Sequence, residues 1–316
     1  MKTTVDWLRF RTQSDPFETL EKVRPAFGTV ADLVAFGVSQ KGKDGWEHRR
    51  EIRLAGDVLL GAVDYGGESR RGWLRWDMSG SGCEWVQDWA VLAGLVHALD
   101  RAELRRVDLA LTTADPSLVS HEIVLAAHAA GQFSNGGRSP KYRLVTGSDP
   151  SDGRTVYVGS RSSAKFIRCY EKGREMMNKA GVPESIKKQV EKVEFDGLGM
   201  VDVSALYRVE VEFKDVETVL PWTMLIDRDS FFAGANPFCA SLLPNAPKRR
   251  VQSLPDFGGK LALQVQIEHA RRAYGGLFRT LFSIHNGDAQ KVLDLVMGDK
   301  PSEKLVKAGV LTMGHE

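Results

Sequence analysis

The chain has 316 residues, of which 42% are hydrophobic and 27% are charged, and its formal net charge is +2. This composition is typical of an ordinary globular protein with enough residues for one large domain or two modest ones. No apolar run approaches the roughly 18 residues of a membrane-spanning helix, and the first residues lack a signal-peptide core. We therefore expect a cytoplasmic protein without a membrane partner. The small net charge neither requires nor excludes nucleic acid, because binding depends on where the charge lies.

Several enzyme classes and site types lack their motifs in this sequence. The cysteines Cys83, Cys169 and Cys239 form no CxxC pair, which argues against disulfides and a structural zinc site. No two histidines stand one residue apart, so a nicking enzyme of the His-hydrophobic-His type is not supported. A His-x-x-Arg sequence at residues 269–272 is followed at once by the last tyrosine, which does not fit a tyrosine recombinase. The absence of a P-loop argues against an ATP-driven helicase.

Period-two alternation, helical spacing and glycine-separated apolar runs predict the elements of the first 130 residues. The segment 5–12 alternates strictly, and Asp15-Pro16 precedes apolar residues at helical spacing. The apolar runs that follow predict an antiparallel meander, closed by a Ser-Gly-Ser-Gly sequence. In chain order we expect strands at 5–12, 51–54, 58–63, 72–78 and 105–111, and helices starting at 16 and covering 85–102 and 117–130.

The remainder of the chain contains more irregular sequence. Residues 131–153 are rich in Gly, Ser, Asn, Asp and Pro and predict a loop. Residues 231–256 contain four prolines and predict a linker or irregular crossing segment. In chain order we expect strands at 155–159, 164–170 and 207–213, and helices over 173–193 and 260–296.

These elements predict an α+β fold: a mainly antiparallel sheet with packed helices, plus a helical C-terminal region. The character of the sequence changes after Pro221. We therefore place a domain boundary near residue 220, so that residues 1–220 form the first domain and residues 221–316 form an irregular linker and a helical C-terminal region.

Three acidic residues fall on two of the expected strands. Asp108 lies on one strand, and Glu210 and Glu212 share a face of another, opposite its apolar side chains. If the two strands are neighbours, the three carboxylates converge, and such oxygen ligands suit Mg²⁺ or Mn²⁺. The alternative is a solvent-facing strand whose acids pair with Arg106 and Arg208, since sheets commonly have one polar face.

A tyrosine on a third expected strand lies among cations. Arg168, Tyr170 and Lys172 share one face if the strand extends that far. A phenol with a pKa near 10 is a poor nucleophile, but nearby cations stabilise the phenolate, and Lys172 can exchange a proton with the reacting oxygens. The alternative is a half-buried strand tyrosine with a hydrogen-bonded hydroxyl.

The segment 152–175 carries six basic residues against three acids, together with several serines. Arg, Lys and Ser side chains supply many of the contacts that proteins make to DNA phosphates. A solvated charged surface is the alternative. The candidate DNA-binding residues are Arg154, Ser160, Arg161, Ser163 and Lys165.

The sequence from Gly153 to Ser163, followed by Phe166 to Glu175, resembles the replication-initiation factors of rolling-circle plasmids and filamentous phages, the Rep_trans-type initiators. Their signature reads roughly T-x-Y-x-G-S-x-x-S and then R-x-Y-(D/E)-K-x-x-E. Residues 106–110 are similar to the family's R-x-D-x-A strand, and residues 208–210 to its R-x-E strand. Asp6-Trp7-Leu8 and the Ser-Gly-Ser-Gly-Cys sequence at 79–83 also resemble N-terminal pieces of the family. The pieces occur in the family's order.

The resemblance implies a DNA nicking-closing enzyme that makes a site-specific, metal-dependent single-strand nick and later rejoins the strand. Tyr170 would attack the scissile phosphate, which leaves a 5′-phosphotyrosine and a free 3′-hydroxyl. Arg168 and Lys172 would neutralise charge on the phosphorane.

The resemblance also implies a set of metal ligands for Mg²⁺ or Mn²⁺. Asp108 and Glu210 are the expected ligands, with Glu175 or Glu212 as the third. Many relatives carry a second aspartate two residues after the alanine of the R-x-D-x-A strand, and this chain has Thr112 there. Either the second acid is not a ligand, or another carboxylate replaces it.

The implied partner is origin DNA, as a hairpin or a single-stranded nick site. A host helicase is expected because the chain has no motor of its own, and plasmid relatives suggest a homodimer. Residues 1–220 would then be the catalytic nicking domain. Two alternatives remain open: a mobilisation or excision relaxase of an integrated element with the same chemistry, and a non-enzymatic origin-binding protein.

Overall fold

The structure, a computed structural model, describes residues 2–136, 138–149, 152–187, 189–195, 197–253 and 258–298. Contacts divide the chain into two compact units, Met1–Ser253 and Leu254–Glu316. The first unit therefore extends beyond residue 220, where the sequence predicts the end of the nicking domain. Where the nicking function ends stays a prediction, and residues 254–257 and 299–316 of the expected C-terminal region lie outside the described residues.

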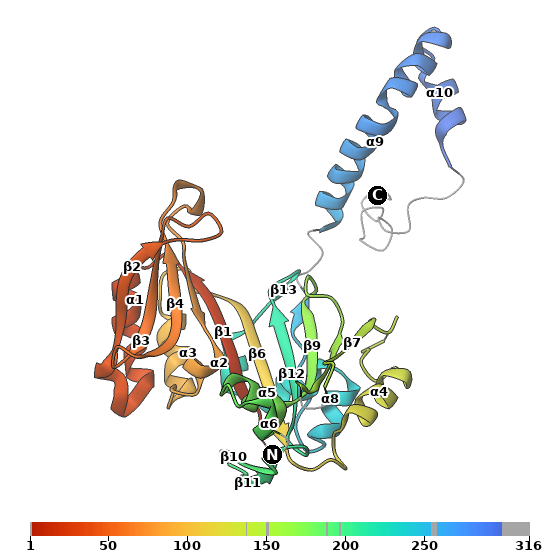
Figure 1. Ribbon diagram of the computed structural model, residues 1–316. Coiled ribbons are helices and arrows are strands. Elements are labelled where there is room, and N and C mark those ends of the chain that lie inside the picture. The colour runs from red at the N-terminus through yellow and green to blue at the C-terminus, as the bar shows by residue number, and fades with distance from the viewer. Residues whose placement is uncertain are drawn as a thin grey trace. The chain divides into compact units, whose positions relative to one another are not determined.

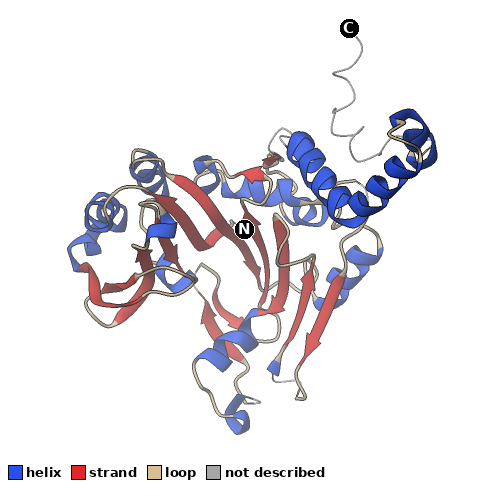
Figure 2. Cartoon of the chain, turned by 90° about the horizontal axis from the view of Figure 1, so that it is seen from above, coloured by secondary structure: helices blue, strands red, loops and turns tan. Residues whose placement is uncertain are grey.

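The first unit is built on a ten-stranded antiparallel sheet (Figure 1, Figure 2). Its central strands come from distant parts of the sequence, whereas one flank is a meander of consecutive strands. The fold is α+β with a mainly antiparallel sheet, as predicted. The sequence did not predict the two edge strands. From edge to edge the strands are β2 (Val34–Lys41), β3 (His48–Leu54), β4 (Val58–Tyr65), β5 (Leu74–Met78), β1 (Thr4–Thr12), β6 (Glu103–Thr113), β12 (Tyr207–Lys214), β9 (Lys165–Glu171), β8 (Arg154–Val158) and β7 (Tyr142–Thr146).

Short helices and two small strand pairs complete this unit. Side-chain caps fix where several helices begin: Asp15, Asp88 and Ser120 each accept hydrogen bonds from backbone amides of the first turn that follows. The α-helices are α1 (Pro16–Val23), α2 (Gly80–Cys83), α3 (Trp89–His97), α4 (His121–Ala129), α5 (Lys172–Lys179), α6 (Glu184–Lys187), α7 (Arg228–Ala235) and α8 (Pro237–Leu242). The 3₁₀ helices are η1 (Arg24–Leu33), η2 (Glu68–Arg70) and η4 (Trp222–Leu225), and the small pairs are β10 (Lys192–Phe195) with β11 (Gly199–Asp202) and β13 (Thr218–Val219) with β14 (Gln252–Ser253).

Three expectations about local structure were wrong. The helix expected over 85–102 is only α3, because its cap is Asp88 and the chain turns before β6. The helix expected over 173–193 ends after α5, because Gly181 adopts a positive φ of 65° and a proline soon follows. The segment 231–256 is not a plain linker, because α7 extends into it and α8 lies within it.

One apolar core lies against a single face of the sheet. The side chains of β12 and β6 that point to it are apolar and fully buried, and they join residues of α3, η4, α7 and α8 in one cluster. Leu104 forms a β-bridge with Leu220, and Phe232 and Phe238 are buried in the core. These contacts explain why the segment after residue 220 belongs to the first unit.

The second unit contains two helices that contact each other, α9 (Gly258–Ile284) and α10 (Ala289–Val296). Asp288 caps α10 by accepting from the backbone amide of Lys291. The prediction of a helical C-terminal region is confirmed for these residues. Within the described ranges, no helix is long and apolar enough to cross a membrane.

Candidate active site

The neighbouring strands β9, β12 and β6 bring five of the predicted residues onto one face of the sheet: Arg168, Tyr170, Asp108, Glu210 and Glu212. Strand β9 does not extend to Lys172, which begins α5. The condition set by the sequence pattern, that the acidic strands lie side by side, is met. This face is opposite the apolar core, and Thr112 falls on it as well. Across β9, β12 and β6 the paired rows are Tyr170–Arg208–Thr112, Arg168–Glu210–Ala110 and Phe166–Glu212–Asp108.

The polar face is largely buried rather than open to solvent. Asp108 is 1% exposed, Glu210 4% and Tyr170 6%. The alternative of a solvent-facing strand is therefore wrong. The acid–arginine pairs that this alternative also predicted are present, because burying an unpaired charge is costly.

Tyr170 lies among three cations. The guanidinium carbon of Arg168 is 4.9 Å from the Tyr170 ring centroid, and the Lys172 Nζ is 6.0 Å from it. Arg208 lies directly opposite Tyr170 on the neighbouring strand β12. Burial raises the pKa of Tyr170 well above its usual value, Arg208 and Arg168 lower it in part, and Glu210 raises it further. The phenol is therefore neutral at rest, with cations placed to stabilise a phenolate.

Arg208 is a site residue to which sequence reasoning assigned no role. Its Nη1 donates to Asp6 Oδ1 at 2.6 Å, and its Nε donates to Thr112 Oγ1 at 2.8 Å. Asp6 is the extra residue of a β-bulge in β1, between Val5 and Trp7, each of which has a partner on β6. The family's N-terminal Asp-Trp-Leu piece was the one signal that could have identified Asp6.

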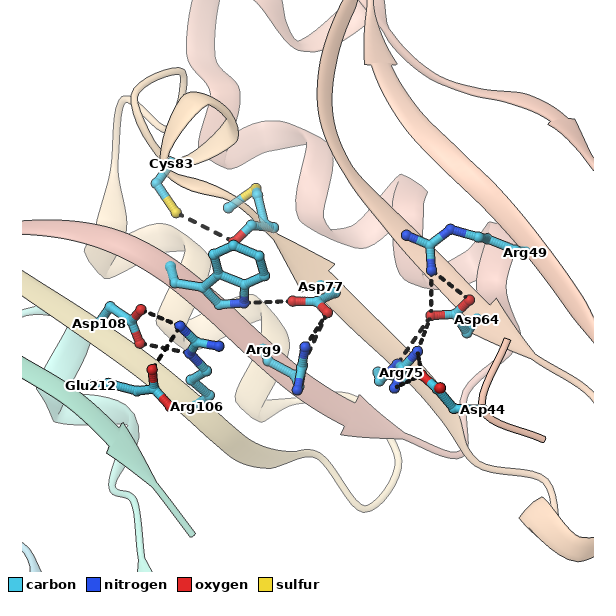
Figure 3. A network of polar contacts seen from close by, with 12 residues as sticks. Arg9, Asp44, Arg49, Asp64, Arg75, Asp77, Cys83, Arg106, Asp108 and Glu212 are labelled. Atoms are coloured by element: carbon cyan, nitrogen blue, oxygen red, sulfur yellow. Dashed lines mark hydrogen bonds and ion pairs between the residues drawn. The ribbon is translucent and has the colours of Figure 1, made fainter. Parts of the chain in front are cut away.

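The carboxylates of this face are each held by a cation (Figure 3). Asp108 accepts from Arg106 Nε at 2.8 Å and Nη2 at 2.5 Å, and Arg106 also pairs with Glu212 at 3.1 Å. Glu210 accepts from Arg168 Nη2 at 2.5 Å. Burial raises the pKa of Asp108 to about 7; Arg106 counteracts this rise, whereas Glu210 and Glu212 add to it.

The fourth predicted metal ligand lies on a different element. Glu175, on α5, pairs with Lys172 at 2.7 Å and with Lys179 at 2.6 Å. Burial would raise the pKa of Glu175, but the two lysines lower it below its usual value. Burial, together with the charge of Arg208, lowers the pKa of Lys172. The structure thus assigns Glu175 a close contact with Lys172, the proposed proton-exchanging residue.

The acids fit a divalent cation in a limited way. Among the described residues, no three His, Cys, Asp or Glu side chains form a group that could enclose a metal ion. The effect of Glu210 and Glu212 on the pKa of Asp108 nevertheless places three hard oxygen donors within one another's field. Mg²⁺ is usually bound by one or two carboxylates plus water and substrate phosphates. The residues therefore suit a cation shared with substrate, and not an all-protein cage.

Four of the predicted DNA-binding residues lie in or next to the turn between β8 and β9, whereas Arg154 lies at the other end of β8. Ser160 and Arg161 are exposed, and Ser163 donates to the Ser160 carbonyl to close the turn. Arg154 pairs with Glu122 and Glu171, each at 3.2 Å, and Lys165 donates to the Ala235 carbonyl at 2.7 Å. The group is therefore partly engaged within the protein, with Arg161 presented to solvent.

Two adjoining cavities lie over this face. One of about 210 Å³ is lined by Tyr170, Arg168 and Arg154 among others. A smaller one of about 50 Å³ is lined by Arg168, Arg106 and the carboxylates of Glu210 and Glu212. Arg168 belongs to both linings.

Comparisons with known proteins find similarity in sequence and in fold. Residues 102–255 match the family model described as replication initiation factor. The structure is similar to that of a rolling circle replication initiator protein from Geobacillus stearothermophilus, with a TM-score of 0.51, 20% sequence identity, and coverage of 74% of this chain and 83% of that one. At this identity the likeness shows a shared fold. No curated protein gives a significant match to the chain.

Proposed function

Because residues 102–255 match the family model of the replication initiation factors, we propose that the chain initiates rolling-circle replication by nicking and rejoining one DNA strand through Tyr170. The observation that supports this most directly is the pairing of β9 with β12. Tyr170 lies opposite Arg208, and in the adjacent row Arg168 lies opposite Glu210. A nucleophile, cations and acids thus share one buried polar face.

The proposed nick is a transesterification at phosphorus. The Tyr170 oxygen forms a bond to the scissile phosphorus, and the bond from that phosphorus to the 3′-oxygen breaks. The phenol loses its proton and the leaving 3′-oxygen gains one, so that a 5′-phosphotyrosine and a 3′-hydroxyl result. Lys172 is suited to exchange these protons, because its lowered pKa makes the neutral amine more accessible. Rejoining is the reverse reaction.

Fixed cations would favour the transition state. Arg168 lies over the Tyr170 ring and Arg208 lies opposite Tyr170 on β12, and both arginines are held by acids, Glu210 and Asp6 respectively. Preorganised donors of this kind stabilise charge that develops on a phosphorane without reorganising during the reaction.

We also propose that the reaction uses Mg²⁺ or Mn²⁺. Asp108 and Glu210 would hold the ion, with Glu212 or Glu175 as a further ligand. A bound divalent ion neutralises charge on the phosphate oxygens. Origin DNA is the proposed substrate, with a host helicase and a second copy of the chain as proposed partners.

The test is covalent capture. The protein is incubated with Mn²⁺ and single-stranded oligonucleotides that tile its own origin, and adducts are resolved on a denaturing gel and mapped to peptides. We expect an adduct on the peptide that contains Tyr170, and its loss in Tyr170→Phe with DNA binding retained. Tyr157→Phe is the matched control, because Tyr157 lies opposite Arg168 on the neighbouring strand and lines the same cavity. An adduct that persists in Tyr170→Phe would place the nucleophile elsewhere, and binding without any adduct would favour the origin-binding alternative.

A further inference from the structure

A third cavity, of about 370 Å³, lies on the first unit beyond the carboxylates. Basic side chains from four sheet strands and from η2 line it, together with one tryptophan. The lining contains seven basic residues and two acidic ones. It consists of Arg9, Arg11, Asp44, Trp46, Arg70, Arg75, Arg105, Arg106, Lys214, Asp215 and Val216.

Acids hold several of these arginines in place (Figure 3). Arg9 pairs with Asp77, and Arg75 pairs with Asp64 at 2.8 Å and with Asp44 at 3.3 Å. A guanidinium has five donor hydrogens, so an arginine held by carboxylates can keep donors for a ligand. Arg70 differs, because within the described part of the chain it donates to the backbone carbonyls of residues 44 and 45. Its charge has no paired acid there.

Arginine side chains of the lining lie over tryptophan rings, one of which, Trp46, lines the cavity itself. The guanidinium carbons of Arg70 and Arg75 lie 4.8 Å and 5.8 Å from the Trp46 ring centroid. Arg11 lies 4.1 Å from the ring of Trp73. Proteins bind single-stranded nucleic acid with aromatic and basic side chains, because the bases stack on the rings and the phosphates pair with the cations.

The cavity continues the candidate active site. Arg106 lines both this cavity and the small one beside Glu210, and Arg168 links that small cavity to the one at Tyr170. On β12, Arg208 lies opposite Tyr170, and Lys214, six residues further along, lines the third cavity. Six residues of strand span roughly 20 Å, so a strand attached at Tyr170 reaches the third cavity after a few nucleotides.

We propose that this Arg–Trp cavity binds one unpaired nucleotide of the strand that flanks the nick, with its phosphate on Arg70 and Arg75 and its base stacked on Trp46. The identity of that strand rests on the proposed function. The volume suits one nucleotide, being at the lower end of the range for small-ligand sites. A duplex keeps its base faces covered and does not offer them to an indole ring.

Binding is tested separately from nicking. Full-length protein with Tyr170→Phe is titrated with a fluorescent oligothymidylate of about 12 nucleotides, and anisotropy gives the Kd. We expect Trp46→Ala to weaken binding roughly 5- to 150-fold, and Trp46→Phe to retain most of the affinity. Arg70→Ala should reduce the slope of log K against log salt by about 0.7.

Arg50→Ala is the matched control, because its guanidinium carbon lies 5.1 Å from the Phe17 ring, outside the cavity. It should leave Kd unchanged. Circular dichroism identifies a variant that fails to fold. If Trp46→Ala fails to fold, the test rests on Arg70→Ala, because Arg70 is a partly exposed residue at the end of η2. Unchanged affinity in folded Trp46→Ala and Arg70→Ala variants would overturn the proposal, as would equal competition by polyglutamate or by duplex DNA.

The two proposals fail in different ways. If the protein with Tyr170 intact forms no covalent adduct but Trp46→Ala still raises the Kd, the nicking function is refuted and the nucleotide site stands. A normal adduct with Kd insensitive to Trp46 and Arg70 would refute the site alone.

Discussion

Arg208 donates a hydrogen bond to Asp6 Oδ1 at 2.6 Å, which ties β12 to β1 across the intervening strand β6. The same guanidinium donates to Thr112 Oγ1, and Arg208 lies opposite Tyr170 in the register of β12 and β9. Asp6 therefore supplies the negative charge next to Arg208, on the face where residue 112 is an uncharged threonine.

We predict that Asp6→Asn slows single-turnover nicking roughly 10- to 100-fold, because Arg208 loses its charged acceptor and its position against Tyr170. The variant should also lose up to about 3 kcal/mol of unfolding free energy, since Arg208 is a buried cation. Rapid-quench nicking assays and urea denaturation measure the two effects. Asp227→Asn, which removes one partner of the exposed Arg249 pair, is the control.

A second change tests the same relationship. Thr112→Asp in the Asp6→Asn background should restore much of the nicking rate. The Arg208 Nε now donates a hydrogen bond to the Thr112 hydroxyl, and it would donate to the new carboxylate at position 112 instead. If the double variant nicks no faster than Asp6→Asn alone, Arg208 does not act through a local carboxylate.

The metal proposal predicts a shift in cation requirement. Glu210→Gln should raise the Mn²⁺ concentration for half-maximal nicking by about 10- to 100-fold or abolish the reaction, because one oxygen ligand loses its charge. Glu51→Gln is the control, since Glu51 is also held by an arginine, Arg53, but on β3. Wild-type Mn²⁺ dependence in Glu210→Gln would remove Glu210 from the set of ligands.

The sequence predicted the strands that carry the site because their alternation is regular. In β12, β6 and β9 one face is apolar, so period two fixes which side chains point away from the core. Register across strands is a tertiary property, and the sequence could only state what would follow if the strands were neighbours. The rows that pair Glu210 with Arg168 came from the structure.

Other features had weaker local signals. Asp6 reaches the site through a β-bulge in β1, and no alternation pattern reveals an inserted residue. The edge strand β7 lies in a segment rich in turn residues, where the loop signal dominated. In the segment 231–256, prolines suggested a linker, yet Pro237 begins α8, a position where its missing amide costs nothing.

A pH effect on stability is expected from His121, which is buried and accepts or donates at 3.3 Å to the Tyr207 hydroxyl. Burial and the charge of Arg154 lower the pKa of His121 below its usual value near 6.5. The folded state then binds fewer protons than the unfolded state, so unfolding free energy falls as pH drops from about 6.5 through the folded-state pKa. Urea denaturation across that window should show this slope in the wild type and a smaller one in His121→Gln; equal slopes would contradict it.

Two glycines should respond oppositely to alanine. A Cβ at Gly82, in α2, would lie 2.0 Å from the backbone oxygen of Leu60 on β4, whereas one at Gly94, inside α3, meets nothing within 4 Å. Gly82→Ala must push α2 away from β4 and should cost about 1–3 kcal/mol. Gly94→Ala should stabilise by about 0.5–1 kcal/mol, because alanine favours the helix. Thermal unfolding measures both.

The same pair of variants links packing to the site. A Cβ at Gly80, in α2, would lie 3.0 Å from Asp6 Oδ1, the acceptor of Arg208. A shift of α2 in Gly82→Ala should therefore also disturb Arg208 and slow nicking, whereas Gly94→Ala should nick at the wild-type rate. If Gly82→Ala lowers stability without changing the nicking rate, then α2 supports the fold but does not position the Asp6–Arg208 pair, and the control of Arg208 must come from β1 and β6 alone.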